Sequence, residues 1–388
     1  MNAAGAAAFF ALLLLPLSVR AGSPTDITAC DSLGCISEAK FSANISHTLG
    51  SNVVGYASIV GGLPPVFGGQ ARTASDPPSA AMSPDLLTNI ASVSKVLTTI
   101  GIFQSLRKKN LTIDAPIYTY IYSDWVQGPN INTITFRDLL THRAGIRTNC
   151  NGSNTTYAVL KALIEQGVNL ADKSVATYNN CNFAIFRELL PVMEGHTLTN
   201  LTDIPRASKS ASLYISYMNE NVFRPLGIRN AQCMPPASGT VDILSYPIPA
   251  GVAHGTDWGD WTLACGGGGW VLSADEIFKV IDDLANGNVL LTSVEKTAMF
   301  TNCLGWDCSV RADCPNPYVC KNGALNNGNL NSISVWTYTG IFKCSVPVVV
   351  LVNSLLPAPY RSAGDIIGLV EHAYKEAAVV GTPKPCRQ

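Results

Sequence analysis

Three short strings, set far apart along the chain, constrain its fold most, because they must come together if they act as one site. They are SVSK (92–95), YNN (178–180) and KNG (321–323), which have the forms S-x-x-K, Y-x-N and K-x-G. Together they supply a hydroxyl nucleophile, two groups able to move its proton, an amide and a cation. These are the parts that a serine acyl-transfer site needs.

Each string taken alone is a weak signal. S-x-x-K begins at four serines and Y-x-N at two tyrosines, namely Ser37, Ser92, Ser105 and Ser293, and Tyr178 and Tyr217. An isolated S-x-x-K is usually a helix cap followed by a surface lysine, which is our interpretation of the other three serines. Tyr217 falls within an amphipathic helical pattern, so we assign it to packing.

The N-terminal segment predicts secretion. Residues 3–15 form an apolar run, and small residues follow as far as Ala21. We interpret residues 1–21 as a signal peptide. A membrane anchor is the alternative, but the run is shorter than the roughly 20 residues that span a bilayer.

The cysteines agree with this compartment. All twelve lie beyond residue 21, and an even number in a secreted chain favours disulfides. The four between residues 303 and 320 could instead bind zinc, but they lack the paired C-x2-C spacing of zinc sites. Five N-x-S/T sequons predict surface positions open to glycosylation: Asn44, Asn110, Asn151, Asn154 and Asn200.

Charge narrows the range of partners. The net charge is −1, and the longest basic block is the run at 107–109. The sequence therefore gives no reason to expect nucleic acid or an anionic membrane as a partner.

Strand and helix patterns are distributed unevenly. Strand patterns occur at 53–71, 333–338 and 347–352, and helical patterns at 87–106, 273–282 and 363–377. Residues 135–262 are mostly helical, and Thr135 and Ser273 are expected to cap helices. We therefore predict an α+β fold: one antiparallel sheet built from both ends of the chain, flanked by helices, with an inserted all-helical lobe at 135–262.

The same patterns suggest a division of the chain. We expect a short lead-in at 22–45, a catalytic domain at 46–380 and a cysteine-rich insertion at 303–320. The site would lie in the cleft between the sheet and the helical lobe.

The residue types suggest individual roles. Ser92 stands at the start of a helical pattern, where free N–H groups favour a developing negative charge. Lys95 follows one turn later on the same face, and partial burial would lower its pKa. Two nearby lysines would lower the pKa of Tyr178 and make it a candidate base. Lys321 could bind a substrate carboxylate, and Gly323 would let the backbone approach the substrate.

Beyond these strings, the chain resembles the serine β-lactamase and penicillin-binding-protein superfamily, in particular its class C and esterase branch. Five further segments carry the resemblance: TNIASVSKVLTT (88–99), LTIDAPI (111–117), FRDLLTHRAGI (136–146), FRPLGI (223–228) and GGGWVLSADEIFKVI (267–281). They occur in the family's order, and the similarity extends from about residue 55 to 355.

The resemblance implies a β-lactamase/transpeptidase-like fold and a role for each site residue. Ser92 resembles the acylated nucleophile, Lys95 the lysine that helps to deprotonate it, and Tyr178 the base. Asn180 resembles the amide that orients the substrate, and Lys321 the lysine that supports the tyrosine. The resemblance places the oxyanion hole at the backbone N–H groups of Ser92 and Ala324, and it makes His142 structural.

Departures from the family pattern leave the substrate open. Asn322 stands where β-lactamases usually have threonine, and no E-x-x-L-N string provides a deacylating glutamate. We therefore expect a secreted serine hydrolase acting on an ester or amide, with a D-amino-acid peptidase or a β-lactamase as alternatives. A non-catalytic secreted binding or scaffold protein is the alternative from another class. A small acyl or peptide substrate is implied, without cofactor or metal.

Overall fold

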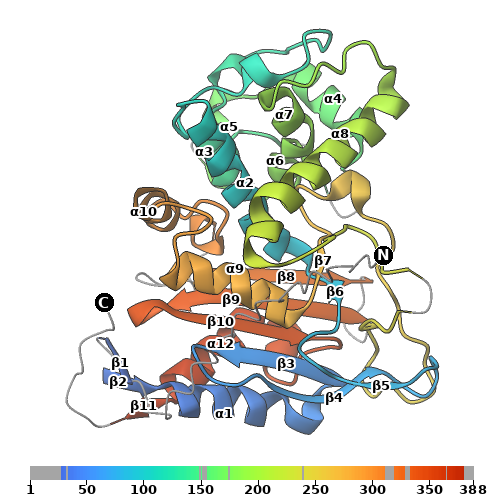
Figure 1. Ribbon diagram of the computed structural model, residues 1–388, viewed down its shortest axis with the longest axis vertical. Coiled ribbons are helices and arrows are strands. Elements are labelled where there is room, and N and C mark those ends of the chain that lie inside the picture. The colour runs from blue at the N-terminus through green and yellow to red at the C-terminus, as the bar shows by residue number, and fades with distance from the viewer. Residues whose placement is uncertain are drawn as a thin grey trace, which may run out of the picture.

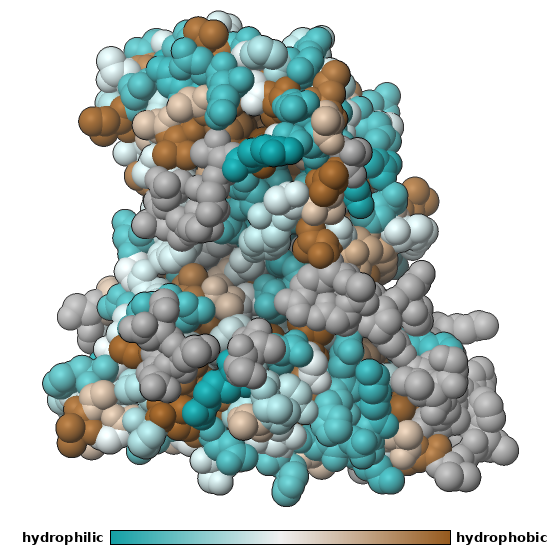
Figure 2. All heavy atoms as spheres, turned by 180° about the vertical axis from the view of Figure 1, so that it is seen from behind, coloured by the Kyte–Doolittle hydropathy of each residue, from teal (hydrophilic) through white to brown (hydrophobic). Residues whose placement is uncertain are grey.

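The computed structural model describes residues 28–31, 34–147, 150, 155–173, 175–237, 240–310, 319–327, 333–363 and 365–379. The predicted signal peptide and the sequons at Asn151 and Asn154 lie outside these residues. Within them, no helix is both long enough and apolar enough to cross a membrane. On the face shown in Figure 2, hydrophilic and hydrophobic residues are interspersed among the coloured atoms.

A six-stranded antiparallel sheet joins the two ends of the chain, which confirms the predicted fold class. Its strand order is β5-β4-β3-β10-β9-β8. The first part of the chain gives β3 (Gly55–Val60), β4 (Val66–Arg72) and β5 (Ala80–Ala81). The last part gives β8 (Val319–Asn326), β9 (Ser334–Phe342) and β10 (Val346–Val352).

Strand β10 shows why the sheet needs a layer of helices on each face. Successive side chains of a strand point to opposite faces. Val348 and Val350 belong to the apolar cluster shared with α1 (Glu38–Leu49) and α12 (Ile366–Lys375). Val349 and Leu351 belong to the cluster on the side of α9 (Ala274–Asn286). The apolar run of β10 is therefore buried on both faces, and Figure 1 shows the helices above and below the sheet.

Helices dominate the part of the chain between β6 (Thr88–Asn89) and β7 (Val271–Leu272). They are α2 (Ser94–Lys108), α3 (Phe136–Leu140), α4 (Tyr157–Gln166), α5 (Leu170–Lys173), α6 (Cys181–Ala184), α7 (Phe186–Met193) and α8 (Asp203–Met218), which a π-helical turn at Asn219–Phe223 extends. In Figure 1 they form the upper lobe, above the sheet. Both predicted caps are confirmed, because Thr135 and Ser273 each form a capping box.

The predicted helix at 87–106 begins too early. Thr88 and Asn89 pair with β7 instead, and the N–H of Ile90 donates to the carbonyl of Trp270 over 2.9 Å. Helix α2 therefore begins only at Ser94. Pairing with a distant strand overrides the local helical pattern here.

The remaining elements complete the lower part of the molecule. Strands β1 (Thr28–Asp31), β2 (Gly34–Ser37) and β11 (Ala378–Val379) form a small separate sheet. Two further helices are α10 (Ser293–Thr301) and α11 (Tyr360–Ala363). Ser37 caps α1 by accepting a hydrogen bond from the N–H of Lys40, as predicted for that S-x-x-K string. Tyr217 is buried in the core, as expected for a packing residue.

Candidate active site

The nucleophile segment is a short turn between strand β6 and helix α2. Ser92 lies in a 3-10 turn at Ala91–Val93, directly before α2, and is half-buried. The side chain of Asn89 accepts a hydrogen bond from the N–H of Ala91 over 2.9 Å. Ala91 has a φ of 48°, an uncommon value for a residue with a side chain. This turn places the Ser92 hydroxyl beside the positive end of the α2 dipole.

Lys95 joins the first two strings of the sequence, SVSK and YNN, into one cluster. Its ammonium donates to Ser92 Oγ over 3.0 Å, to Asn180 Oδ1 over 2.8 Å and to the carbonyl of Gly267. The side chain has no exposed surface. Burial lowers the pKa of Lys95, and the positive charge of Lys321 adds to this effect, while Tyr178 opposes it. Lys95 therefore gives up a proton more readily than a surface lysine does.

Tyr178 is the second group that contacts the Ser92 hydroxyl. Its hydroxyl lies 2.6 Å from Ser92 Oγ, and the residue is 42% exposed. The ammonium groups of Lys95 and Lys321 each lie 5.0 Å from the centre of its ring. Desolvation by itself would raise the pKa of Tyr178, but the two positive charges outweigh it, so the pKa lies below the usual value of 10.0.

His142 supports Tyr178 from the side of the helical lobe. The two ring centres lie 4.6 Å apart, and His142 Nδ1 accepts from the N–H of Asn179 over 3.2 Å. His142 is 4% exposed. Burial, together with the charges of Lys95 and Lys321, lowers its pKa well below 6.5. The imidazole is therefore uncharged at neutral pH. An uncharged ring suits a residue that positions Tyr178 and adds no positive charge to the site.

Lys321 has a partner that sequence reasoning missed. It lies on β8, is 1% exposed, and forms an ion pair with Asp307, whose side chain is 2% exposed. The other carboxylate oxygen of Asp307 accepts from the N–H of Asn322 over 2.8 Å. A buried lysine requires a counter-charge, so a partner could be expected. The sequence alone did not identify which of the acidic residues supplies it.

Gly323 lets strand β8 lie directly against the nucleophile segment. A Cβ at this position would stand 2.4 Å from the carbonyl oxygen of Ile90 and 3.1 Å from the nitrogen of Ser92. Any side chain would force the two segments apart. The close approach brings Ala324 to the wall of the same pocket as Ser92.

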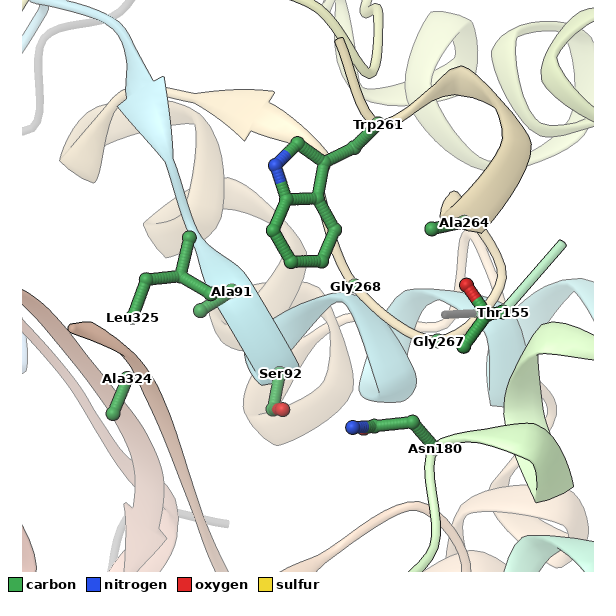
Figure 3. Close-up of a pocket in the computed structure, with 10 residues that line it drawn as sticks. All are labelled: Ala91, Ser92, Thr155, Asn180, Trp261, Ala264, Gly267, Gly268, Ala324 and Leu325. Carbon is green, nitrogen blue, oxygen red and sulfur yellow. The ribbon is translucent and has the colours of Figure 1, made fainter. Parts of the chain in front are cut away.

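The pocket beside Ser92 is small, about 100 Å³. Figure 3 shows the Trp261 indole projecting into it and the Asn180 side chain extending toward Ser92. The described residues that line it carry no ionisable side chain: Ala91, Ser92, Thr155, Asn180, Trp261, Ala264, Gly267, Gly268, Ala324 and Leu325. Thr155 and Trp261 had no place in the sequence-based site, because nothing in the local pattern marks either residue.

Disulfides adjoin several of these segments. Cys150 pairs with Cys181, which follows Asn180; Cys233 pairs with Cys265, close to Gly267; and Cys303 pairs with Cys308, which follows Asp307. Cys320, next to Lys321, is also disulfide-bonded. The disulfide interpretation of the cysteine-rich segment is confirmed for the Cys303–Cys308 pair. In the described part of the chain, no three His, Cys, Asp or Glu side chains are grouped to hold a metal ion.

Comparisons with known proteins concern the family and the fold. The family model described as Beta-lactamase matches residues 50–307. The putative penicillin-binding protein PbpX of Bacillus subtilis (strain 168) is 26% identical over 144 residues, which cover 37% of this chain and 32% of that protein. The match therefore spans about a third of the relative's length.

Two solved structures share the fold. The β-lactamase/D-alanine carboxypeptidase from Pseudomonas syringae has a TM-score of 0.64 at 14% identity, covering 88% of this chain and 99% of that one. The D-stereospecific amidohydrolase from Streptomyces sp. has a TM-score of 0.58 at 15% identity, covering 87% and 98%. At these identities the likeness concerns the fold.

Proposed function

The chain belongs to the β-lactamase family, and on that premise we propose that it is a secreted serine hydrolase that forms an acyl-enzyme on Ser92 with an ester or amide substrate. One observation carries the proposal: Ser92 Oγ lies within hydrogen-bond distance of both the Lys95 ammonium and the Tyr178 hydroxyl. A serine hydroxyl is a weak nucleophile until a neighbouring base takes its proton. Here two groups with lowered pKa values face that hydroxyl.

Acylation would follow directly from this geometry. Ser92 Oγ attacks the substrate carbonyl while its proton passes to Tyr178, with Lys95 holding the hydroxyl in place. The backbone N–H groups of Ser92 and Ala324 would bind the negatively charged carbonyl oxygen of the intermediate. When the intermediate collapses, Tyr178 returns the proton to the departing alcohol or amine.

Deacylation would use the same groups in reverse. Water attacks the acyl-serine, Tyr178 takes its proton, and Ser92 Oγ regains a proton as the acid leaves. Asn180 would orient the substrate, because its side chain lines the pocket and is fixed by Lys95. Gly323 would contribute indirectly, because its missing side chain lets β8 lie against the nucleophile segment.

Two further activities stay as second candidates. The Pseudomonas syringae neighbour is described as a β-lactamase/D-alanine carboxypeptidase and the Streptomyces one as a D-stereospecific amidohydrolase. Both descriptions favour small D-amino-acid or β-lactam compounds as alternatives to a simple ester. A non-catalytic binding role is less favoured, because such relatives would be expected to lose Ser92, Lys95 or Tyr178.

Secretion is part of the proposal. We assign residues 1–21 to a signal peptide, 22–45 to a lead-in and 46–380 to the catalytic domain, with a helical lobe at about 135–262. The disulfides support this compartment, because such bonds persist in oxidising surroundings. Asn110 and Asn200 are exposed and would be open to glycosylation.

Covalent labelling tests the proposal. The secreted protein is incubated with an activated acyl ester, a fluorophosphonate or a slowly hydrolysed β-lactam, and the adduct is located by intact-mass and peptide analysis. We expect an adduct on Ser92 that is absent from Ser92→Ala, and the probe that reacts narrows the substrate class. Absence of any adduct in folded, disulfide-bonded protein would favour the binding role instead.

A further inference from the structure

We propose that Asp307 neutralises Lys321, so that the leaving-group side of the cleft selects uncharged leaving groups over those carrying a carboxylate. This inference rests on the proposed function and names its substrate class. The sequence predicts that Lys321 binds a substrate carboxylate. The ion pair with Asp307 instead favours a substrate without a carboxylate at this position.

The Lys321–Asp307 pair is built into the fold. Both side chains are buried, and the second carboxylate oxygen of Asp307 accepts from the N–H of Asn322. Asp307 begins a short 3-10 turn, and the Cys303–Cys308 disulfide closes the loop around it. A carboxylate held by an ammonium, a backbone N–H and a cross-linked loop is fixed in place, so it stays beside Lys321 when substrate enters.

The position of Lys321 relative to Tyr178 defines the side of the cleft concerned. Tyr178 would give its proton to the leaving group, so the leaving group must lie beside the tyrosine hydroxyl. The Lys321 ammonium lies 5.0 Å from the centre of the Tyr178 ring. A carboxylate on the leaving group would therefore approach Lys321, and it would meet the negative charge of Asp307 there.

Electrostatics decides which substrate is favoured. An unpaired buried ammonium attracts a carboxylate strongly, whereas a paired one offers little net attraction. Lys95, the other cation of the cluster, already donates to Ser92, Asn180 and Gly267. An uncharged leaving group therefore fits the site better.

Two matched esters test the selectivity: the butyryl esters of 3-hydroxybenzamide and of 3-hydroxybenzoate. The two esters share the acyl group. The leaving group of the first carries an uncharged amide, and that of the second carries a carboxylate. We expect wild-type kcat/KM, corrected for the hydroxide-catalysed rates, to be higher for the amide than for the carboxylate. Equal values, or a higher value for the carboxylate, would overturn the inference.

Asp307→Asn is the informative variant, because asparagine keeps the shape and can still accept from Asn322. Removing the negative charge should raise the relative kcat/KM of the carboxylate ester by about tenfold or more, mainly through KM. Asp307→Glu, which keeps the charge, should stay close to the wild-type ratio. An unchanged ratio in folded Asp307→Asn would contradict the inference.

A pH profile of Asp307→Asn distinguishes the loss of the negative charge from a structural defect caused by the substitution. The charged groups facing Tyr178 are Lys95, Lys321 and, behind Lys321, Asp307; His142 beside the ring is neutral. The negative charge of Asp307 raises the pKa of Tyr178, although less than desolvation does. Asp307→Asn should therefore move the lower limb of the kcat/KM profile to lower pH, whereas a purely structural defect would reduce kcat without moving it.

A binding measurement distinguishes this inference from the proposed function. Benzoate and benzamide are titrated calorimetrically into wild type and Asp307→Asn. If Asp307→Asn gains about tenfold in benzoate affinity but neither ester acylates Ser92, the proposed function fails and the charge assignment stands. If the esters acylate Ser92 and neither the kcat/KM ratio nor the affinity responds to the variant, the function stands and this inference fails.

Discussion

Ser92 Oγ and Tyr178 Oη lie 2.6 Å apart, although 86 residues separate them in the sequence. The turn between β6 and α2 positions the serine, and the segment before α6 positions the tyrosine. Lys95 bridges the two segments by donating to Ser92 and to Asn180. The reactive hydroxyl thus depends on contacts between the nucleophile segment and the segment that precedes α6.

Removal of either proton-handling group should nearly abolish turnover. We expect Lys95→Ala and Tyr178→Phe each to reduce kcat by about a thousandfold or more, because such groups act as a unit. The measurement is steady-state hydrolysis of an activated ester, with circular dichroism to check the fold. Ser293→Ala, which alters an exposed S-x-x-K string on α10, serves as the control and should retain wild-type kcat. A Tyr178→Phe variant with near-normal kcat would rule out the tyrosine as base.

The pH dependence of kcat/KM should reflect the ionisation of the Tyr178 hydroxyl. A base must be deprotonated to act, so activity is lost as the pH falls through its pKa. Because the pKa of Tyr178 is lowered, this limb should lie below pH 10. It should disappear in Tyr178→Phe. A limb near pH 6.5 that is abolished by His142→Gln would instead identify the histidine as the base, against its buried, neutral state.

Local patterns account for most of what the sequence predicts correctly. The apolar run of β10 and the capping boxes at Thr135 and Ser273 are decided by neighbouring residues, so they can be recognised without the fold. The start of α2 could not be predicted, because the pairing of β6 with β7 depends on residues far along the chain.

The same distinction applies to the candidate site. The first two strings carry Ser92, Lys95 and Tyr178, and the structure brings these side chains into contact. Asp307 was missed because its partner, Lys321, lies 14 positions further along the chain, beyond a cysteine-rich stretch whose sequence shows no strand or helix periodicity. Trp261 was missed for a similar reason: it reaches the pocket from a stretch without regular strand or helix.

Trp261 should limit the length of the acyl group. Its indole fills part of a small pocket, and its Nε1 donates to the carbonyl of Trp258 over 2.7 Å. In Trp261→Ala we expect kcat/KM for an octanoyl ester, relative to an acetyl ester, to rise about tenfold or more, since each buried CH2 contributes about 0.8 kcal/mol. Trp258→Ala removes the same type of side chain outside the pocket lining and should leave the ratio near wild type. An unchanged ratio in Trp261→Ala would place the acyl chain elsewhere.

The Cys150–Cys181 disulfide should stabilise both the fold and the site. The two cysteines are 31 residues apart, so their cross-link should contribute about 3–4 kcal/mol to the free energy of unfolding. Cys181 directly follows Asn180, so the double Cys150→Ser/Cys181→Ser variant should also label Ser92 more slowly below its unfolding transition. Urea unfolding and timed labelling measure the two effects. A variant with unchanged midpoint and labelling rate would show that packing alone fixes this segment.

The pairing of β3 with β10 has a consequence for biosynthesis. Val350 of β10 lies opposite Ser58 of β3, so the middle of the sheet joins residues from the two ends of the polypeptide. Contacts of such long range form late, because the loop between them must close first. Strand β3 therefore lacks its neighbour β10 until the ribosome has synthesised the segment that forms β10. Synthesis of the last strands, rather than of the nucleophile helix, sets the earliest moment at which this protein can assemble its sheet.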